Sequence, residues 1–347
     1  MIYKEKDYIK KYTISDSSYK KMEYIYKENL KQKIFSYMRE GTHDSVVPLL
    51  LDSSLISPTQ YDYKIIQCGK YMQVYKLNEI RKKRPTKENK SLEISIKFDV
   101  DRLYKKENYN KRNELKQIEY KNILRSKLQL QRIVKSNEEE FKTFITLTFG
   151  ENKYTDISEA NKKFDIWRTK IKSIFKDFKY VCVPEYQKGR EKKYGYAVVH
   201  YHLLTNLEIK KIYKYIRRNK ELKTPLIIPQ QQFSDTQLKN MSLEQRKRCY
   251  DVKYWSYGYS SVYPLKNINV VGYLTKYMTK DIDNRLFGKR KYLNSRNLNM
   301  PREFTIDSRV NKGYDRLFMI EHLYDKQFSN SYLDYFGNIV DFTEYKL

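Results

Sequence analysis

An apolar run in the middle of the chain, residues 196–204, carries two histidines separated by one residue. It reads Tyr-Ala-Val-Val-His-Tyr-His-Leu-Leu, and this content predicts a buried strand. Side chains alternate between the two faces of a strand, so His200 and His202 share one face. The 347 residues include only four histidines. The pair therefore indicates a metal site, and two imidazoles that only pack against a neighbouring strand are the alternative.

The charge of the chain indicates a polyanionic partner. Its 70 Lys and Arg residues exceed its 42 Asp and Glu residues, for a formal net charge of +28, and the basic residues are spread along the sequence. Nucleic acid is the commonest partner of such a protein. An acidic membrane surface is the rival, but no apolar run approaches the roughly 18 residues that a span needs. We expect no membrane partner.

Cysteine usage and the first residues of the chain predict a cytoplasmic protein. The three cysteines are odd in number and far apart, which fits a reducing compartment and neither a disulfide framework nor a Cys-rich zinc site. The N-terminal residues lack the apolar core of a signal peptide. We expect the protein to stay in the cytoplasm of the bacterial cell that makes it.

Composition and length predict more than one part in this chain. Residues 1–60 are polar, with helical patches and no visible chemistry. Residues 61–310 contain the clearest strand and helix patterns, with a polar insertion at 220–252. Residues 311–347 form a C-terminal extension.

Alternating and helical patterns within residues 61–310 predict an α+β fold. Strands are expected at residues 61–77 (two strands around a turn at 68–70), 141–149, 179–185, 196–204 and 254–263. Helices are expected at residues 113–137, 156–178 and 206–219, and in a segment that begins at Asn267 or Asn269. A charged turn at residues 187–195 is expected to join two antiparallel strands.

The last of these predicted helices carries two tyrosines and two lysines on one face. At 3.6 residues per turn, Tyr273, Lys276, Tyr277 and Lys280 fall within about 100° of the helix surface. A phenol is a poor nucleophile because its pKa lies near 10, but a nearby ammonium group favours the phenolate and steadies a phosphate under attack. Tyrosine beside lysine can therefore attack a phosphodiester. The same spacing also suits a helix face that packs on a sheet.

The paired histidines and the tyrosine helix complement one another chemically. Glu185, on the strand before the histidines, offers a carboxylate. A divalent metal on His200, His202 and Glu185 would bind a phosphate oxygen and neutralise charge in the transition state, while one tyrosine attacks in line.

Three motifs in this order resemble the HUH-endonuclease superfamily, specifically the rolling-circle replication initiators of phages and plasmids. They are the strand 144–149 (FITLTF), the motif 200–204 (HYHLL) and the segment 273–280 (YLTKYMTK). Residues 287–301 are also similar to the segment after the tyrosine helix in phage-type members, and the likeness covers about residues 61–301. The resemblance implies a central antiparallel sheet of about five strands flanked by helices, here with a helical, basic N-terminal extension.

The resemblance also implies a metal centre. Mg²⁺ or Mn²⁺ would bind His200 and His202 together with a third polar ligand. We expect Glu185 in that role. The turn between Glu185 and His200 is long, however, so Gln187 or Glu191 is an alternative.

Tyr273 and Tyr277 are the nucleophile candidates that the resemblance implies. One would open and the other close a round of replication through a 5′-phosphotyrosine intermediate that leaves a free 3′-OH. Lys276 and Lys280 would assist at the phosphate. The expected function is thus a site-specific DNA nickase and ligase that initiates rolling-circle replication.

The expected partners are DNA, as a single-stranded or hairpin origin, and a host helicase and polymerase. No Gly-rich phosphate loop is present, so a helicase would be a separate protein. A conjugative relaxase that uses the same chemistry is one rival. A non-catalytic nucleic-acid-binding protein, whose tyrosines stack on bases, is another.

Overall fold

A computed structural model of the chain describes residues 60–82, 111–150, 154–242, 245–246, 249–265, 284–309, 317–322, 324–334 and 337–346. The chain divides into two compact units, residues 1–107 with 301–347 and residues 108–300. The predicted nicking domain, 61–310, contains strands of both units. The predicted N-terminal extension and the tyrosine helix lie almost wholly outside the described residues.

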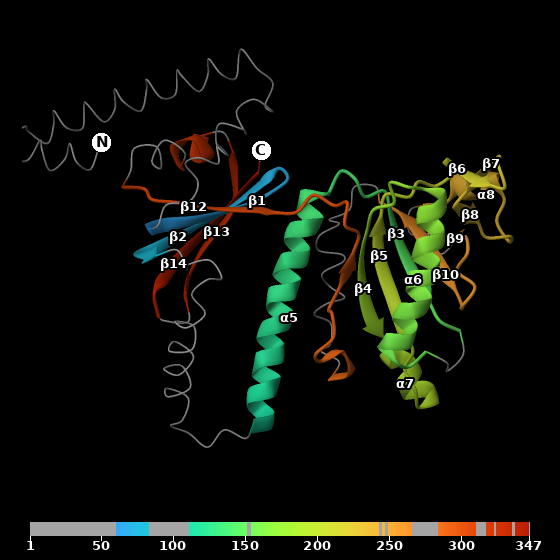
Figure 1. Cartoon of the computed structure of the whole chain (residues 1–347), viewed down its shortest axis with the longest axis horizontal. Helices are drawn as coiled ribbons and strands as arrows, with labels where there is room; N and C mark the ends of the chain where they lie inside the picture. Colours follow the sequence, from blue (N-terminus) through green and yellow to red (C-terminus); the bar gives the residue numbers. More distant parts are fainter. Residues whose placement is uncertain are drawn as a thin grey trace, which may run out of the picture. The chain divides into compact units, whose positions relative to one another are not determined.

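Residues 108–300 are built on a five-stranded antiparallel sheet in the order β10-β3-β5-β4-β11 (Figure 1). The strands are β3 (Thr143–Thr148), β4 (Tyr180–Tyr186), β5 (Val199–Thr205), β10 (Ser260–Pro264) and β11 (Leu293–Asn294). This confirms the predicted α+β fold and its antiparallel sheet. The strands are rich in β-branched and aromatic residues, which suit a pleated, buried surface.

Helix α6 (Ile157–Ile174) covers one face of this sheet (Figure 1). The carboxylate of Asp156 caps it by accepting a 2.9 Å hydrogen bond from the Ser158 backbone N–H. Its buried residues recur every three or four positions, which makes one apolar stripe. They are Ile157, Ala160, Phe164, Trp167, Ile171 and Ile174.

Helix α5 (Lys111–Ser136) packs on the opposite face of the sheet. Its buried residues Leu130, Ile133 and Val134 join one apolar cluster with sheet residues. The sheet residues of this cluster, here called the α5 cluster, include Phe144, Val181, Val183 and Leu204. Along each strand they alternate with residues of the α6 side, so the sheet is covered by helices on both faces, and the two predicted helices at 113–137 and 156–178 are confirmed.

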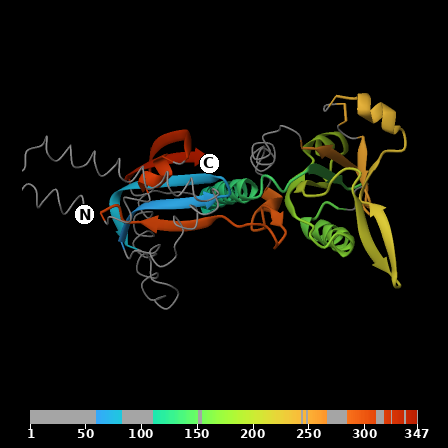
Figure 2. The ribbon, with the colours of Figure 1, turned by 90° about the horizontal axis from the view of Figure 1, so that it is seen from above.

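The segment after β5 corrects a prediction. Residues 206–219, predicted as a helix, contain strand β6 (Ile212–Arg217), which pairs with β7 (Lys220–Pro225). Arg218 and Asn219 have φ of 48° and 62°, the conformation of a two-residue hairpin turn. Ile212 and Ile216 are 59% and 65% exposed, so the helical spacing of apolar residues finds no core to cover. Figure 2 shows this hairpin, in yellow, projecting from the sheet.

The predicted charged turn at 187–195 is a short helix, α7 (Lys188–Tyr194). Gly195 ends it in the left-handed conformation, with φ of 76°, and its N–H bonds to Glu191 O. The strands on either side, β4 and β5, are antiparallel neighbours, as predicted. The polar segment 220–252 contains strands of its own. They are β7, β8 (Ile227–Pro229) and β9 (Tyr250–Val252), and helix α8 (Asp235–Asn240) lies between the last two.

The other unit, in its described part, contains a second five-stranded antiparallel sheet in the order β12-β1-β2-β14-β13. Its strands are β1 (Gln60–Cys68), β2 (Tyr71–Lys82), β12 (Arg302–Ile306), β13 (Asp325–Leu333) and β14 (Ile339–Lys346). The predicted β1–β2 hairpin is confirmed, and Gly69 makes its turn with φ of 59°. Strand β14 then pairs with β2, from the other end of the chain.

Among the described residues, none of the helices combines the length and hydrophobicity that crossing a membrane demands.

The largest fully buried side chain, Trp167, allows a test of the α6 core. Trp167 is 1% exposed and its indole N–H donates to Lys253 O at 3.1 Å. We expect Trp167→Ala to lower the free energy of unfolding by about 3–5 kcal/mol through the cavity it leaves. Ile166→Ala on the same helix, at a side chain 56% exposed, should change it by less than about 0.5 kcal/mol. Urea titrations followed by the fluorescence of Trp255 measure both, and equal midpoints would contradict this packing.

Candidate functional site

The two histidines of β5 lie on the face of the sheet that α5 covers only in part. Between them, Tyr201 points the opposite way and stacks on Phe164 of α6, with ring centroids 4.9 Å apart. The alternation of a strand thus places His200 and His202 together, as predicted from their spacing. Their ring centroids are 6.2 Å apart.

Each imidazole faces an oxygen of the neighbouring segment. His202 Nε2 lies 2.8 Å from Glu185 Oε2, and His200 Nε2 lies 2.7 Å from Gln187 Oε1. Glu185 is opposite His200 in the β4–β5 register, so its side chain reaches diagonally to His202. The structure therefore brings two of the three candidate third ligands to the histidines. The remaining candidate, Glu191, instead forms an ion pair with Arg285 at 3.0 and 3.1 Å.

The ring of His202 is oriented by two residues of β3. Its Nδ1 lies 3.3 Å from Thr146 Oγ1, and its ring stacks on Phe144 at 5.8 Å between centroids. Thr146 is directly opposite His202 in the β3–β5 register. Such a partner on Nδ1 fixes the orientation of an imidazole whose Nε2 serves as a ligand.

Burial keeps the other histidine neutral. Desolvation lowers the pKa of His200 to about 4, and the neighbouring His202 lowers it further, while Glu185 acts in the opposite direction. A neutral imidazole has a lone pair for a metal ion, whereas a protonated one does not. His200 is thus ready as a ligand at neutral pH.

A cavity of about 790 Å³ opens beside the histidines. The sheet supplies one wall and the 220–252 insertion another. The sheet residues are Phe144, Thr146, Thr148, His200, His202, Tyr259, Ser260, Ser261 and Tyr263, and the insertion residues are Gln230, Gln232, Phe233, Gln245 and Cys249, with Gln187 and Arg190 from the segment between β4 and β5. The insertion is therefore part of the site, which its polar composition alone did not reveal.

The walls of this cavity are polar but nearly uncharged. Arg190 is the one cation that lines it among the described residues, and its guanidinium donates to Phe149 O at 3.3 Å. Gln230 is held by a 3.4 Å hydrogen bond from its amide to Asp251 Oδ1, which also accepts from Ser260 Oγ at 3.3 Å. Amide and aromatic side chains of this kind can hydrogen-bond to and stack on nucleobases.

Tyr259 is a cavity residue that the sequence reasoning missed. Its side chain is 75% exposed, and it is held in place because Thr148 N–H donates to Tyr259 O at 2.7 Å. Gly258, just before it, lies so close to β3 that a Cβ would stand 2.2 Å from backbone atoms of Gly150 and Thr148. The only sequence signal is the Tyr-Gly-Tyr run of residues 257–259, which is weak in a chain with 35 tyrosines.

The predicted nucleophiles and their lysines, Tyr273, Lys276, Tyr277 and Lys280, lie outside the described residues. Their roles stay predictions.

The donors at the histidines suit a hard divalent cation with mixed nitrogen and oxygen ligands. In an octahedral site with bonds near 2.1 Å, adjacent ligand atoms lie about 3 Å apart, close to the 2.7 and 2.8 Å seen for the two nitrogen–oxygen pairs. Within the described ranges, however, no cluster of three or more His, Cys, Asp and Glu side chains is arranged to hold a metal. The imidazoles face two different oxygens, so a shared ion requires these two hydrogen bonds to give way to bonds to one centre.

Fold and site together define a class of protein. A strongly basic chain, with a polar cavity on a sheet and imidazoles at its base, is typical of proteins that act on nucleic acid. Residues 142–282, less than half of the chain, match the family model of the replication-associated protein ORF2. This segment includes β3, β4, β5 and β10, and the match supports a role in the initiation of DNA replication. The chain matches no curated protein and no solved structure.

Proposed function

We propose that the protein is a metal-dependent, site-specific single-strand DNA endonuclease and ligase that initiates rolling-circle replication through a 5′-phosphotyrosine intermediate. The observation that carries this proposal is the convergence of His200, His202, Glu185 and Gln187 at one cavity. This convergence lies within the segment that matches a replication family.

In this proposal the metal is Mg²⁺ or Mn²⁺, held by His200 and His202 with Glu185, and with Gln187 as a further oxygen donor. When bound, it would polarise the scissile phosphate and neutralise its developing charge. Arg190 is the described cation best placed to hold the same phosphate. The glutamines of the cavity wall would contact the bases next to it.

The nucleophile is Tyr273 or Tyr277. Its phenol oxygen forms a bond to phosphorus while the bond from phosphorus to the 3′ oxygen breaks, and the leaving 3′ oxygen takes up a proton. Lys276 and Lys280 lower the pKa of the phenol and stabilise the phosphate. Attack by a 3′-OH on the phosphotyrosine reverses these changes and joins DNA ends. The 3′-OH meanwhile primes a polymerase of the host, with a host helicase separating the strands.

A supercoiled plasmid that carries the DNA flanking the gene tests the proposed function. Incubation with the full chain and Mn²⁺ should give nicked circles in which protein is covalently attached to a DNA 5′ end, and a chelator should prevent both. The control is a plasmid without the flanking DNA. Tight binding without nicking or attachment would reject the enzyme and support a non-catalytic nucleic-acid-binding protein.

Thr146 offers a prediction that separates ligand orientation from folding. Thr146→Val removes the group beside His202 Nδ1 with little change of volume, and we expect it to weaken Mn²⁺ binding about 10–100-fold. Thr146→Ser keeps a hydroxyl and should retain most of the affinity. Isothermal titration of both variants with Mn²⁺ is the measurement. Identical affinities for valine and serine would remove Thr146 from the metal site.

A further inference from the structure

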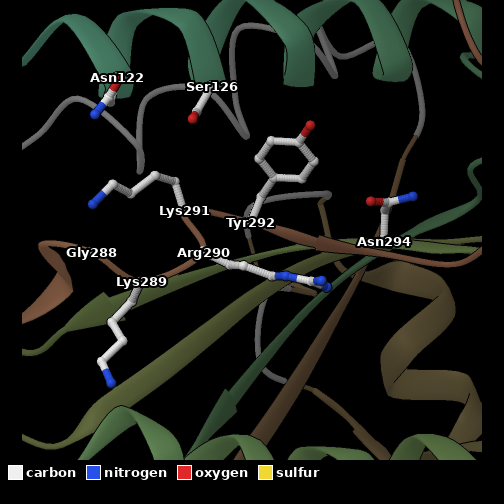
Figure 3. A pocket seen from close by; sticks show the side chains of 8 residues that line it. All are labelled: Asn122, Ser126, Gly288, Lys289, Arg290, Lys291, Tyr292 and Asn294. Atoms are coloured by element: carbon white, nitrogen blue, oxygen red, sulfur yellow. The ribbon is translucent and has the colours of Figure 1, made fainter. Parts of the chain in front are cut away.

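A second cavity, of about 490 Å³, lies between α5 and the segment that follows the tyrosine region (Figure 3). We call residues 285–299 the basic strap. Helix α5 contributes Asn122 and Ser126, and the strap contributes Lys289, Arg290, Lys291 and Tyr292. No acidic residue lines this cavity among the described residues, in contrast to its three cations.

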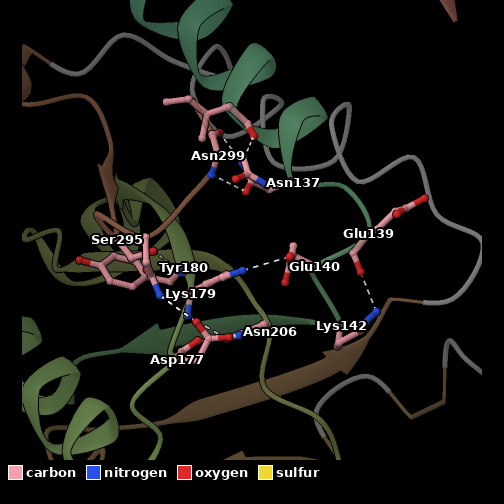
Figure 4. A network of polar contacts seen from close by, with 12 residues as sticks. Asn137, Glu139, Glu140, Lys142, Asp177, Lys179, Tyr180, Asn206, Ser295 and Asn299 are labelled. Carbon is pink, nitrogen blue, oxygen red and sulfur yellow. Dashed lines mark hydrogen bonds and ion pairs between the residues drawn. The ribbon is translucent and has the colours of Figure 1, made fainter. Parts of the chain in front are cut away.

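The C-terminal half of the strap is fixed to the rest of the unit (Figure 4). Ser295 N–H donates to Tyr180 O at 2.9 Å, and Ser295 Oγ accepts from Tyr180 N–H at 3.1 Å. Asn137, just after α5, donates to Asn299 O and accepts from Asn299 N–H, both at 2.8 Å. Because Asn137 is 2% exposed, these are buried hydrogen bonds, which hold the strap against α5.

The other end of the strap is fixed as well. Arg285, in the 3₁₀ turn η4 (Asn284–Leu286), pairs with Glu191 at 3.0 and 3.1 Å and lies over the Tyr186 ring at 4.1 Å. Gly288 turns the chain with φ of 68°, and Lys291 Nζ donates to Leu286 O. The walls of the cavity are therefore held before any ligand arrives, which lowers the entropic cost of binding.

Two of the three cations remain available to a ligand. Lys289 and Arg290 are exposed, and neither forms an ion pair with a carboxylate of the described residues. Figure 3 shows Lys291 extending toward the side of Asn122 and the Tyr292 ring standing toward α5. The cavity thus combines exposed positive charge with neutral amide, hydroxyl and phenol groups.

The second cavity lies on the same face of the sheet as the histidines. Tyr292 packs against the α5 cluster, which also contains Phe144 and Val183. Phe144 in turn stacks on His202. A DNA strand that follows this face from the histidines toward α5 therefore meets the strap.

We propose that this second cavity binds the phosphodiester backbone of single-stranded DNA, so that Lys289 and Arg290 neutralise phosphates of the strand whose cleaved phosphate lies at the histidines. The inference rests on the proposed function for the identity of that strand. Exposed cations beside neutral hydrogen-bonding groups are typical of backbone contacts, which position a strand without reading its sequence. The division of labour is then physical, because the histidine cavity is almost uncharged and the strap supplies the charge.

The test compares two variants that remove the same charge. Lys289→Gln with Arg290→Gln changes the strap, and Lys172→Gln with Lys176→Gln changes exposed residues at and beyond the end of α6, on the opposite side of the sheet. The probe is fluorescein-labelled oligothymidine in EDTA, with binding followed by anisotropy across a salt series. The strap variant should bind roughly tenfold more weakly near 0.15 M salt, and its plot of log affinity against log salt should be shallower by about 1.4, from two phosphates at about 0.7 each.

The control variant should keep the slope of the unchanged protein. Equal losses in the two variants, or none in either, would overturn the inference, as would a loss confined to duplex DNA of the same length. Displacement of the oligonucleotide by inorganic phosphate at constant ionic strength, in the unchanged protein and not in the strap variant, would assign the cavity to a small anion instead. Binding in EDTA requires no nicking, so a protein that passes here and fails to nick would sink the proposed function alone.

Discussion

Replacing both His200 and His202 by alanine is expected to abolish Mn²⁺ binding and to slow nicking of the flanking-DNA plasmid at least about 10³-fold. The reason is that the metal contributes several kcal/mol of charge stabilisation to the transition state, and each 1.4 kcal/mol corresponds to a factor of ten. Isothermal titration measures the first effect and the appearance of nicked circles the second. DNA binding in EDTA should persist, because the cations of the strap are unchanged.

Tyr201→Phe is the matched control for the histidine variant. It changes the same strand but the opposite face, where the Tyr201 hydroxyl donates to Asn161 Oδ1 at 2.8 Å. We expect a loss of about 1 kcal/mol in stability and normal nicking. Because alanine at position 202 leaves Glu185 without its imidazole, His202→Asn provides a second variant that keeps a polar group there. If the alanine and asparagine variants stay folded and nick at the normal rate, the histidines have no part in the reaction.

Local patterns predicted the parts of the site that a single strand or helix determines. The period of two in β5 gave the shared face of His200 and His202, and the spacing of apolar residues gave α5 and α6. The strand β6 was mistaken for a helix because Ile212 and Ile216 happen to follow helical spacing. Pairing with β7 through a tight turn decides the outcome there.

Features that depend on pairing between distant segments could not be predicted. The third-ligand question is one example, since Glu185, Gln187 and Glu191 are separated only by which side chain reaches the histidines. The glutamine wall is another, because Gln230 reaches the cavity through hydrogen bonds to Asp251 on β9. The sheet formed from both ends of the chain is a third: β14 joins β2 in a register that no local period encodes.

Replacing both Tyr273 and Tyr277 by phenylalanine is expected to eliminate covalent attachment of the protein to DNA, whereas each single variant should retain part of it. Four residues apart on a helix, the two side chains differ by about 40° in direction, so either phenol can approach the same phosphate. Phenylalanine keeps the ring and removes only the nucleophilic oxygen, which should leave oligothymidine binding unchanged. Transfer of label from an oligonucleotide to protein, resolved under denaturing conditions, is the measurement.

Tyr259 is the control that makes this experiment decisive. It is the exposed phenol that the structure places on the cavity of the histidines, and it precedes β10 instead of lying in the segment 273–280. Tyr259→Phe should leave covalent attachment intact and at most weaken stacking of a base, worth about 1–3 kcal/mol of binding. Loss of attachment in Tyr259→Phe, with attachment preserved in the Tyr273→Phe plus Tyr277→Phe variant, would move the nucleophile to the sheet and refute the role of the tyrosine helix.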